Sequence, residues 1–106
     1  MHFRTLAYLQ RFVPGDPAAS DPADRVDAWQ QGRSFRCQVE PITSTQLVRA
    51  GRDSAEKQIR VYYRPYGVAL DNSSRIKIAG TEWDVVYADP IRSKLTTAYV
   101  DCKEAP

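Results

Sequence analysis

The fold is decided by two alternating runs, Ser34–Glu40 (SFRCQVE) and Gln58–Arg64 (QIRVYYR), and by the long connection between them. Each run has one apolar face, made of Phe35, Cys37 and Val39 in the first and of Ile59, Val61 and Tyr63 in the second. Such period-two alternation is typical of strands that are half-buried against a core. The connection is much longer than the roughly two to five residues usual in a hairpin loop, and long connections often carry function.

The connection contains one predicted short helix, Ser44–Ala50. Ser44 is expected to be its N-cap, and Gly51 suits the left-handed residue that follows a last helical turn. A capping box from Ser44 would need Glu or Gln at position 47, where the chain has Leu47. We therefore expect the two strands to form the scaffold and the connection to carry the function.

The rest of the chain reads as short strands separated by turns. Before the two runs we expect a strand at Thr5–Val13, a polar mobile loop at Pro14–Arg25, a brief strand at Val26–Gln30 with Trp29 packed inward, and a turn at Gln31–Gly32. After them we expect turns at Pro65–Gly67 and Asp71–Ser74, strands at Arg75–Ile78 and Glu82–Tyr87 joined through Gly80, and a last strand from about Lys94 to Cys102. Six or so strands predict an all-β protein, a small barrel or sandwich, with one short helix in a long inter-strand loop.

Alternation also predicts which side chains face the core. The expected inner residues of the later strands are Ile76 and Ile78, then Trp83, Val85 and Tyr87, then Ala98, Val100 and Cys102. The first strand is ambiguous, because its inner face could be Leu6, Tyr8 and Phe12 or else Ala7, Leu9 and Val13.

Length and composition limit the class of protein. A chain of 106 residues predicts a single domain over residues 1–106. Its formal net charge of +2 is too small to diagnose a nucleic-acid or membrane partner. No apolar run is long enough to span a membrane, and the start of the chain, Met1–Arg4, lacks the apolar core of a signal peptide. We expect a soluble cytoplasmic protein with no membrane partner.

No motif in the sequence predicts catalysis. The single histidine is His2, and Cys37 and Cys102 do not form a C-x-x-C pair, so no zinc set is present. Phosphate-loop, dinucleotide and nucleophile-elbow motifs are also missing. We expect no enzyme, no cofactor and no metal. The two cysteines are expected to be buried thiols of a reducing compartment, with a disulfide as the alternative.

One basic and aromatic run, Arg60–Tyr66 (RVYYRPY), raises a nucleic-acid hypothesis. Tyrosine beside arginine can stack single-stranded nucleic acid on small β-barrels. However, Tyr63 shares a face with Ile59 and Val61 and is expected in the core, while Tyr62 and Tyr66 would cover a sheet edge. The small net charge also supplies little of the electrostatic attraction that such binding needs.

The order and spacing of the whole set resemble the head–tail joining family of long-tailed phages and gene transfer agents, also called head-closure or stopper proteins. The similar segments are Tyr8–Arg11, Cys37–Gly51 with its Val-Glu-Pro triplet, Gln58–Pro65, Ser74–Gly80, Trp83–Tyr87 and Val100–Glu104. The Pro14–Arg25 loop is longer and richer in proline than the family pattern.

The resemblance implies a structural connector that forms a ring, dodecameric in the particle, under the portal adaptor. The ring would help to retain packaged DNA in its channel and offer the attachment surface for a tail terminator or other tail protein. By position, the channel or partner loop is Thr43–Lys57, with Ser44, Gln46, Arg49, Arg52 and Lys57 as its contact residues. The protein would assemble in the host cytoplasm and then reside in the virion or phage-like particle, at the head–tail interface.

Two alternatives remain open from the sequence. The first is a tail-completion or terminator ring, which would co-purify with tails. The second is a free single-stranded nucleic-acid-binding barrel, whose binding would depend steeply on salt. An ordinary surface helix that covers one end of the barrel is the alternative reading of Ser44–Ala50.

Overall fold

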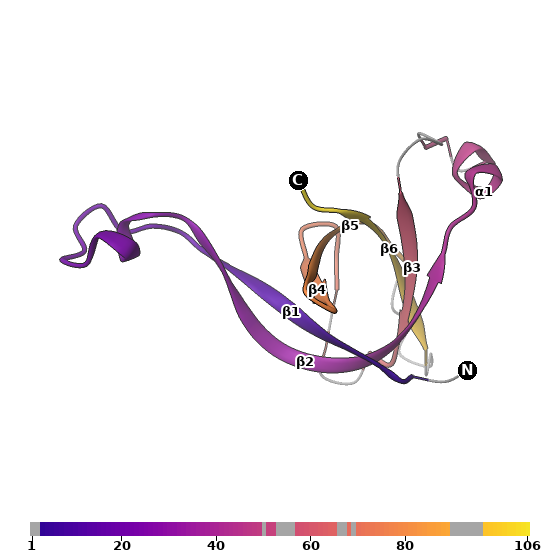
Figure 1. Ribbon diagram of the computed structural model, residues 1–106, viewed down its shortest axis with the longest axis horizontal. Helices are drawn as coiled ribbons and strands as arrows, with labels where there is room; N and C mark the ends of the chain where they lie inside the picture. The colour runs from indigo at the N-terminus through magenta and orange to yellow at the C-terminus, as the bar shows by residue number, and fades with distance from the viewer. Residues whose placement is uncertain (1–2, 50, 53–56, 66–67, 69, 90–96) are drawn as a thin grey trace.

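The computed structural model describes residues 3–49, 51–52, 57–65, 68, 70–89 and 97–106. Its antiparallel strands close into one barrel in the order β1-β2-β3-β6-β5-β4. The bounds are β1 Thr5–Val13, β2 Ala28–Pro41, β3 Gln58–Tyr63, β4 Arg75–Ile78, β5 Thr81–Ala88 and β6 Ala98–Glu104, with a helix α1 at Ser44–Arg49 between β2 and β3 (Figure 1). The predicted all-β fold with one short helix in a long loop is confirmed, and of the two expected forms it is the barrel.

The core is built from the inner faces that alternation predicts. Phe35 and Cys37 of β2 and all three apolar residues of β3 are buried, while Val39 is partly buried against them. The inner residues of the neighbouring strands complete one cluster with Ile76, Ile78, Trp83, Val85, Ala98, Val100 and Cys102. Both cysteines are buried free thiols, as expected. Burial raises the pKa of Cys37 to about 11 and, together with nearby carboxylates, that of Cys102 to about 12.

Strand β1 closes the barrel because it pairs with strands on both of its sides. Its inner half pairs with β2 through Ala7 opposite Phe35, and with β4 through Ala7 opposite Ile78. Ala7 is fully buried and Leu9 packs against the core, whereas Leu6 and Phe12 are exposed. This settles the ambiguous face of the first strand.

The expected turn at Gln31–Gly32 is wrong, because β2 runs unbroken through it. The pairing with β1 shifts register there: Tyr8 lies opposite Ser34, but Gln10 lies opposite Gln31, so β2 has one extra residue at this point. This is a β-bulge, which bends and twists a strand. Glycine fits the site, because a Cβ on Gly32 would lie 2.9 Å from the carbonyl oxygen of Leu9.

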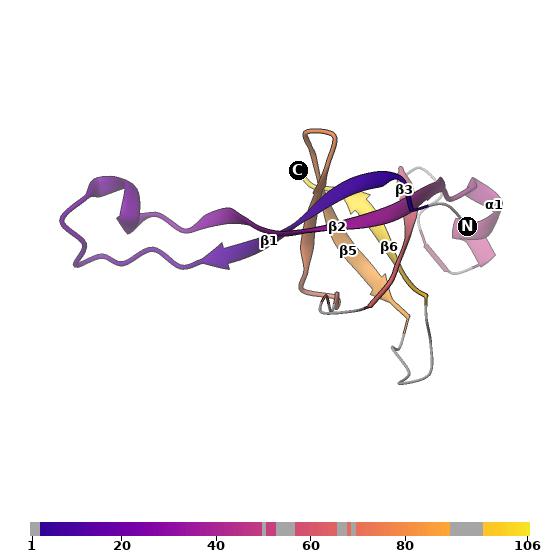
Figure 2. The same ribbon diagram turned by 90° about the horizontal axis from the view of Figure 1, so that it is seen from below.

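Beyond the bulge and the pair Gln10–Gln31, β1 and β2 leave the barrel together as a two-stranded arm, residues 11–30 (Figures 1 and 2). The arm accounts for the elongated shape, with extents of 49 × 33 × 24 Å. Trp29 therefore does not pack into the barrel core as expected. It lies half-buried on the arm, edge-to-face with Phe12 at 5.3 Å between ring centroids, and under the guanidinium of Arg75 at 4.5 Å.

The tip of the arm, residues 14–27, contains the loop expected at Pro14–Arg25, and its own hydrogen bonds hold it. Asp21 caps a 3₁₀-helix at Pro22–Arg25 by accepting from the N–H of Ala23 at 3.0 Å. Asp27 accepts from the N–H of Gly15 at 2.7 Å, and the guanidinium of Arg25 donates to the carbonyl of Ala19. The tip is thus a defined structure.

The last two strands show one further difference from the expected pattern. A register shift between Val85 and Tyr87 places Tyr87 on the outer face, where it is exposed. The last strand begins at Ala98 in the described residues, and the expected start near Lys94 lies outside them.

Both thiols should resist modification in the folded protein. Each is fully buried, and the raised pKa values keep them protonated at pH 8. We expect a chromogenic disulfide reagent to react with them at least about a hundredfold more slowly in buffer than in denaturant, since reaction needs opening of the barrel. Two free thiols per chain should appear in denaturant without reductant. One fast-reacting thiol in the native protein, or none in denaturant, would contradict this.

Candidate functional site

The connection between β2 and β3, called here the insert (Thr43–Lys57), is closed at its base by the barrel. Pro41 lies opposite Ile59 in the sheet, and the N–H of Ile42 donates to the carbonyl of Gln58 at 3.1 Å. The two ends of the insert therefore meet at the mouth of an ordinary hairpin. The connection between the strands is therefore much longer than the closing of this hairpin requires.

Helix α1 begins with a reciprocal capping box, one residue earlier than expected. The N–H of Gln46 donates to Oγ1 of Thr43 at 3.2 Å, and the N–H of Thr43 donates to Oε1 of Gln46 at 2.9 Å. Thr43 is the N-cap and Gln46 is the third helical residue, which is the arrangement of the sequence pattern T-x-x-Q. The prediction of Ser44 as N-cap is therefore wrong: Ser44 is the first residue of the helix.

The end of the helix and the next residues fold back onto the barrel. Leu47 is 1% exposed, although it lies outside the main core cluster. Gly51 has φ 71°, as expected of the left-handed residue after a helix, and its N–H donates to the carbonyl of Val48. The N–H of Arg52 donates to the carbonyl of Leu47 at 2.8 Å. These bonds direct the Arg52 side chain toward the sheet.

Arg52 meets a carboxylate that is fully buried on the outer face of the sheet. Asp101 of β6 accepts from Arg52 Nη1 at 2.9 Å, and from Nε and Nη2 of Arg60 at 2.8 and 3.2 Å. Its side chain is 0% exposed, while those of Arg52 and Arg60 are 21% and 31% exposed. The hydrogen bonds to Asp101 raise the pKa of Arg60 above its ordinary value. A buried carboxylate with both oxygens satisfied by arginine holds the insert to strands β3 and β6.

Three tyrosines surround this ion pair. Arg60 lies over the Tyr99 ring at 4.5 Å, and Arg52 lies over the Tyr87 ring at 5.5 Å. Tyr99 also contacts Tyr62 and Tyr87, with ring centroids 5.9 and 6.1 Å apart. Burial is the main cause that raises the pKa of Tyr99. The arginine of the Arg60–Tyr66 run that stacks here is thus already paired with Asp101, and Tyr63 is in the core, as expected.

The structure places the five predicted contact residues in different settings. Ser44 starts α1, Gln46 is exposed but bonded to Thr43, and Arg49 and Lys57 are exposed. Arg52 is the exception, because it is held by Asp101 and acts on the position of the insert. Sequence reasoning missed Asp101. Because Asp101 lies between the inward residues Val100 and Cys102, its side chain is expected to point outward. Nothing in the neighbouring sequence shows that Arg60, its partner in the adjacent strand, and Arg52 bury it.

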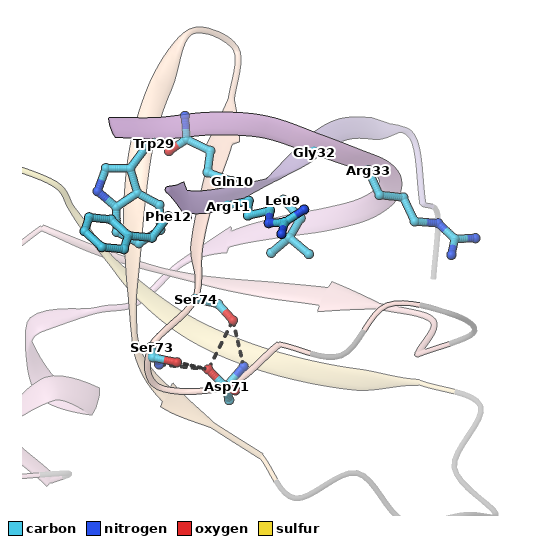
Figure 3. A pocket seen from close by; sticks show the side chains of 10 residues that line it. All are labelled: Leu9, Gln10, Arg11, Phe12, Trp29, Gly32, Arg33, Asp71, Ser73 and Ser74. Atoms are coloured by element: carbon cyan, nitrogen blue, oxygen red, sulfur yellow. Dashed lines mark hydrogen bonds between the residues drawn. The ribbon is translucent and has the colours of Figure 1, made fainter. Parts of the chain in front are cut away.

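A separate hollow of about 710 Å³ lies where the arm joins the barrel (Figure 3). Its walls are the arm root and the turn Asp71–Ser74, and its lining residues are Leu9, Gln10, Arg11, Phe12, Trp29, Gly32, Arg33, Asp71, Ser73 and Ser74. Hydrogen bonds from the Ser73 and Ser74 groups hold the pKa of Asp71 below its usual value. These bonds stabilise the turn at Asp71–Ser74, so the Asp71 carboxylate has a structural role at the edge of the hollow.

Within the part of the chain that the structure describes, no three His, Cys, Asp or Glu side chains are grouped so that they could hold a metal ion. No described helix is both long and apolar enough to cross a membrane.

Fold and site together define a small closed antiparallel β-barrel that carries two added segments, the arm and the insert. The sequence model of the phage head completion protein family matches residues 2–105. The chain therefore belongs to the phage head completion protein family, a family of structural proteins that is not known for enzymes. The resemblance seen in the sequence is confirmed, and with it a structural part in completing the phage head.

A solved structure shows the same fold. The solution structure of protein SF1141 from Shigella flexneri 2a aligns with a TM-score of 0.69 at 17% sequence identity, over 96% of this chain and 92% of that one. At this identity the likeness concerns the fold alone. The search of curated proteins found no match.

Removing the buried carboxylate should destabilise the barrel and loosen the insert. In Asp101→Asn both guanidiniums lose their charge partner, and we expect the free energy of unfolding to fall by about 2–4 kcal/mol. The matched control is Asp84→Asn, which removes a carboxylate that is 30% exposed and bonded to Arg75, and should cost less than about 1 kcal/mol.

Urea unfolding of the two variants measures this difference, and limited trypsin digestion measures release of the insert. Asp101→Asn should be cut faster at Arg49 and Arg52 than the wild type or Asp84→Asn. Equal losses of stability in both variants, with unchanged cleavage, would show that Asp101 does not hold the insert.

Proposed function

We propose that this protein is the head-closure ring of its particle. Twelve identical barrels, the number that the resemblance implies, stand in a circle under the portal adaptor. The ring helps to retain packaged DNA and offers its other side to a tail terminator or tail protein. It assembles in the host cytoplasm and remains in the particle at the head–tail interface. Membership of the head completion family supports the setting.

The observation that carries the proposal is that the insert extends beyond the point where β2 and β3 stop pairing. The hairpin of β2 and β3 is already closed at Ile42 and Gln58, so the insert is free to serve another purpose. The capping box of Thr43 and Gln46, the burial of Leu47 and the pairing of Arg52 with Asp101 hold the described residues 43–49 and 51–52 in place. A fixed projection can be aimed at a channel.

The exposed residues of the insert suit contact with DNA and with neighbouring protein. Arg49 and Lys57 present positive charge, and Val48 is 64% exposed. One such contact is weak, because few phosphates are neutralised. Repeated around a ring, the same contact becomes strong through effective concentration. Arg52 contributes indirectly, since it fixes the direction in which α1 points.

Shortening the insert tests this role. Replacing Ser44–Glu56 by Asn-Gly turns the connection into a short hairpin loop with a favoured turn sequence. We expect the barrel to stay folded by circular dichroism, and filled heads completed with this variant to lose DNA, measured as nuclease-sensitive genome. Heads completed with wild-type protein are the control. An unfolded variant would assign the insert to the scaffold, and full DNA retention would overturn the retention role.

The free protein should not form a stable ring. Without the portal adaptor as a template, each contact lacks the multivalent support of the circle, so we expect a monomer or a weak association. Light scattering over a range of concentrations measures this. A tight oligomer of the free protein would contradict the proposal, as would co-purification with tails in place of heads.

A further inference from the structure

The tip of the arm is acidic and is held by its own hydrogen bonds. Residues 14–27 contain four aspartates and one arginine. Three of the aspartates, Asp16, Asp21 and Asp27, accept hydrogen bonds from backbone N–H groups of the tip and so fix its shape. The carboxylate of Asp24 is exposed and has no such bond in the described residues. Beside it, Val26 is 66% exposed.

An arginine patch lies beside the start of β1, whereas the arm tip follows the other end of that strand (Figures 1 and 2). Arg4, Arg36 and Arg64 are adjacent there, because Cys37 pairs with Thr5 on one side and with Tyr63 on the other. Arg36 donates to the carbonyl of Arg4 at 3.3 Å, and all three arginines are exposed. Within the described part of the chain none of them forms an ion pair.

The patch also has an apolar part. Arg64 lies over the ring of Phe3 at 5.1 Å, and Leu6, directly opposite Arg36 in the sheet, is 38% exposed. The tip and the patch therefore match in two respects. The carboxylates of the tip are opposite in charge to the guanidiniums of the patch, and the apolar Val26 of the tip has a counterpart in Phe3 and Leu6 of the patch. A contact with an apolar centre and charged surroundings is the usual composition of a protein interface.

We propose that the arm tip (residues 14–27) of one subunit docks on the arginine patch (Arg4, Arg36, Arg64) of a second copy of this chain. The two surfaces lie at opposite ends of β1, so they cannot meet within one molecule. A contact between two different surfaces joins copies head to tail and closes into a ring when the rotation permits. The docking rests on the proposed ring and names the surfaces that build it.

The character of the contact explains how assembly could depend on a template. Ion pairs between exposed side chains are individually weak and are screened by salt. A single tip–patch contact would then be short-lived, whereas a ring in which every copy makes two such contacts is held by all of them together.

Charge exchange between the two surfaces tests the docking. The tip variant is Asp24→Lys with Val26→Lys, which leaves the three capping aspartates in place, and the patch variant is Arg36→Glu with Arg64→Glu. The matched control for the tip is Glu104→Lys, a reversal of the same sign at an exposed residue of β6. Circular dichroism first establishes that each variant is folded.

Sedimentation of the full chain at low salt then measures association. We expect weak association of wild type and of Glu104→Lys, at least tenfold weaker association of either variant alone, and recovery when the two variants are mixed in equal amounts. Raising the salt concentration should abolish the association. No salt-sensitive association of the wild type, or no recovery in the mixture, overturns the docking.

Head completion distinguishes this docking from the proposed function. Tip-variant protein that completes heads normally would overturn the docking and leave the head-closure role standing. A mixture that recovers association while wild-type protein fails to close heads would leave the docking standing and overturn the role.

Discussion

The structure depends on the double pairing of β1, which closes the sheet between β2 and β4. Closure removes the edges of a small sheet and so allows a short chain to bury a continuous core. β1 can do this and still leave the barrel because of the bulge at Gly32, opposite Leu9. On one side of the bulge the two strands belong to the barrel. On the other side they form the arm, whose inner contacts are those of Trp29 with Phe12 and Arg75.

The insert is positioned by contacts of a different kind from those that position the arm. It is held by a local helix cap at its start and by a long-range ion pair after the helix, where Arg52 reaches Asp101. Because Asp101 also binds Arg60 of the adjacent strand, the same carboxylate supports the sheet and orients the insert. Two projections thus leave one barrel at different places, and each is fixed by contacts that do not involve the other.

Local patterns predicted most of the fold. Alternation located β3 and the core faces of β2, β4 and β6, because a residue on a half-buried strand shows its side by its polarity alone. The errors came at irregular positions. Gly32 was interpreted as a turn when it is the bulge, and this reversed the side on which Trp29 lies. A second bulge did the same for Tyr87. A bulge depends on the partner strand, and that partner is not visible in a local window.

The candidate site was predictable in its place but not in its contacts. The length and composition of the connection pointed to Thr43–Lys57. The pattern Thr43-x-x-Gln46 also indicates the helix cap, although Ser44 was predicted in its place. Asp101 could not be found, since its partners Arg60 and Arg52 are far away in the sequence. The hydrogen bonds of the arm tip were likewise hidden, because prolines and aspartates are as common in open loops as in capped turns.

An electron cryomicroscopy reconstruction of the completed head tests the central claim most directly. The account predicts a ring of barrels under the portal adaptor, with α1 of every copy facing the channel and Arg52 still bound to Asp101. A ring in which Thr43–Lys57 packs only against its own barrel, touching neither the channel nor a neighbouring subunit, would contradict it.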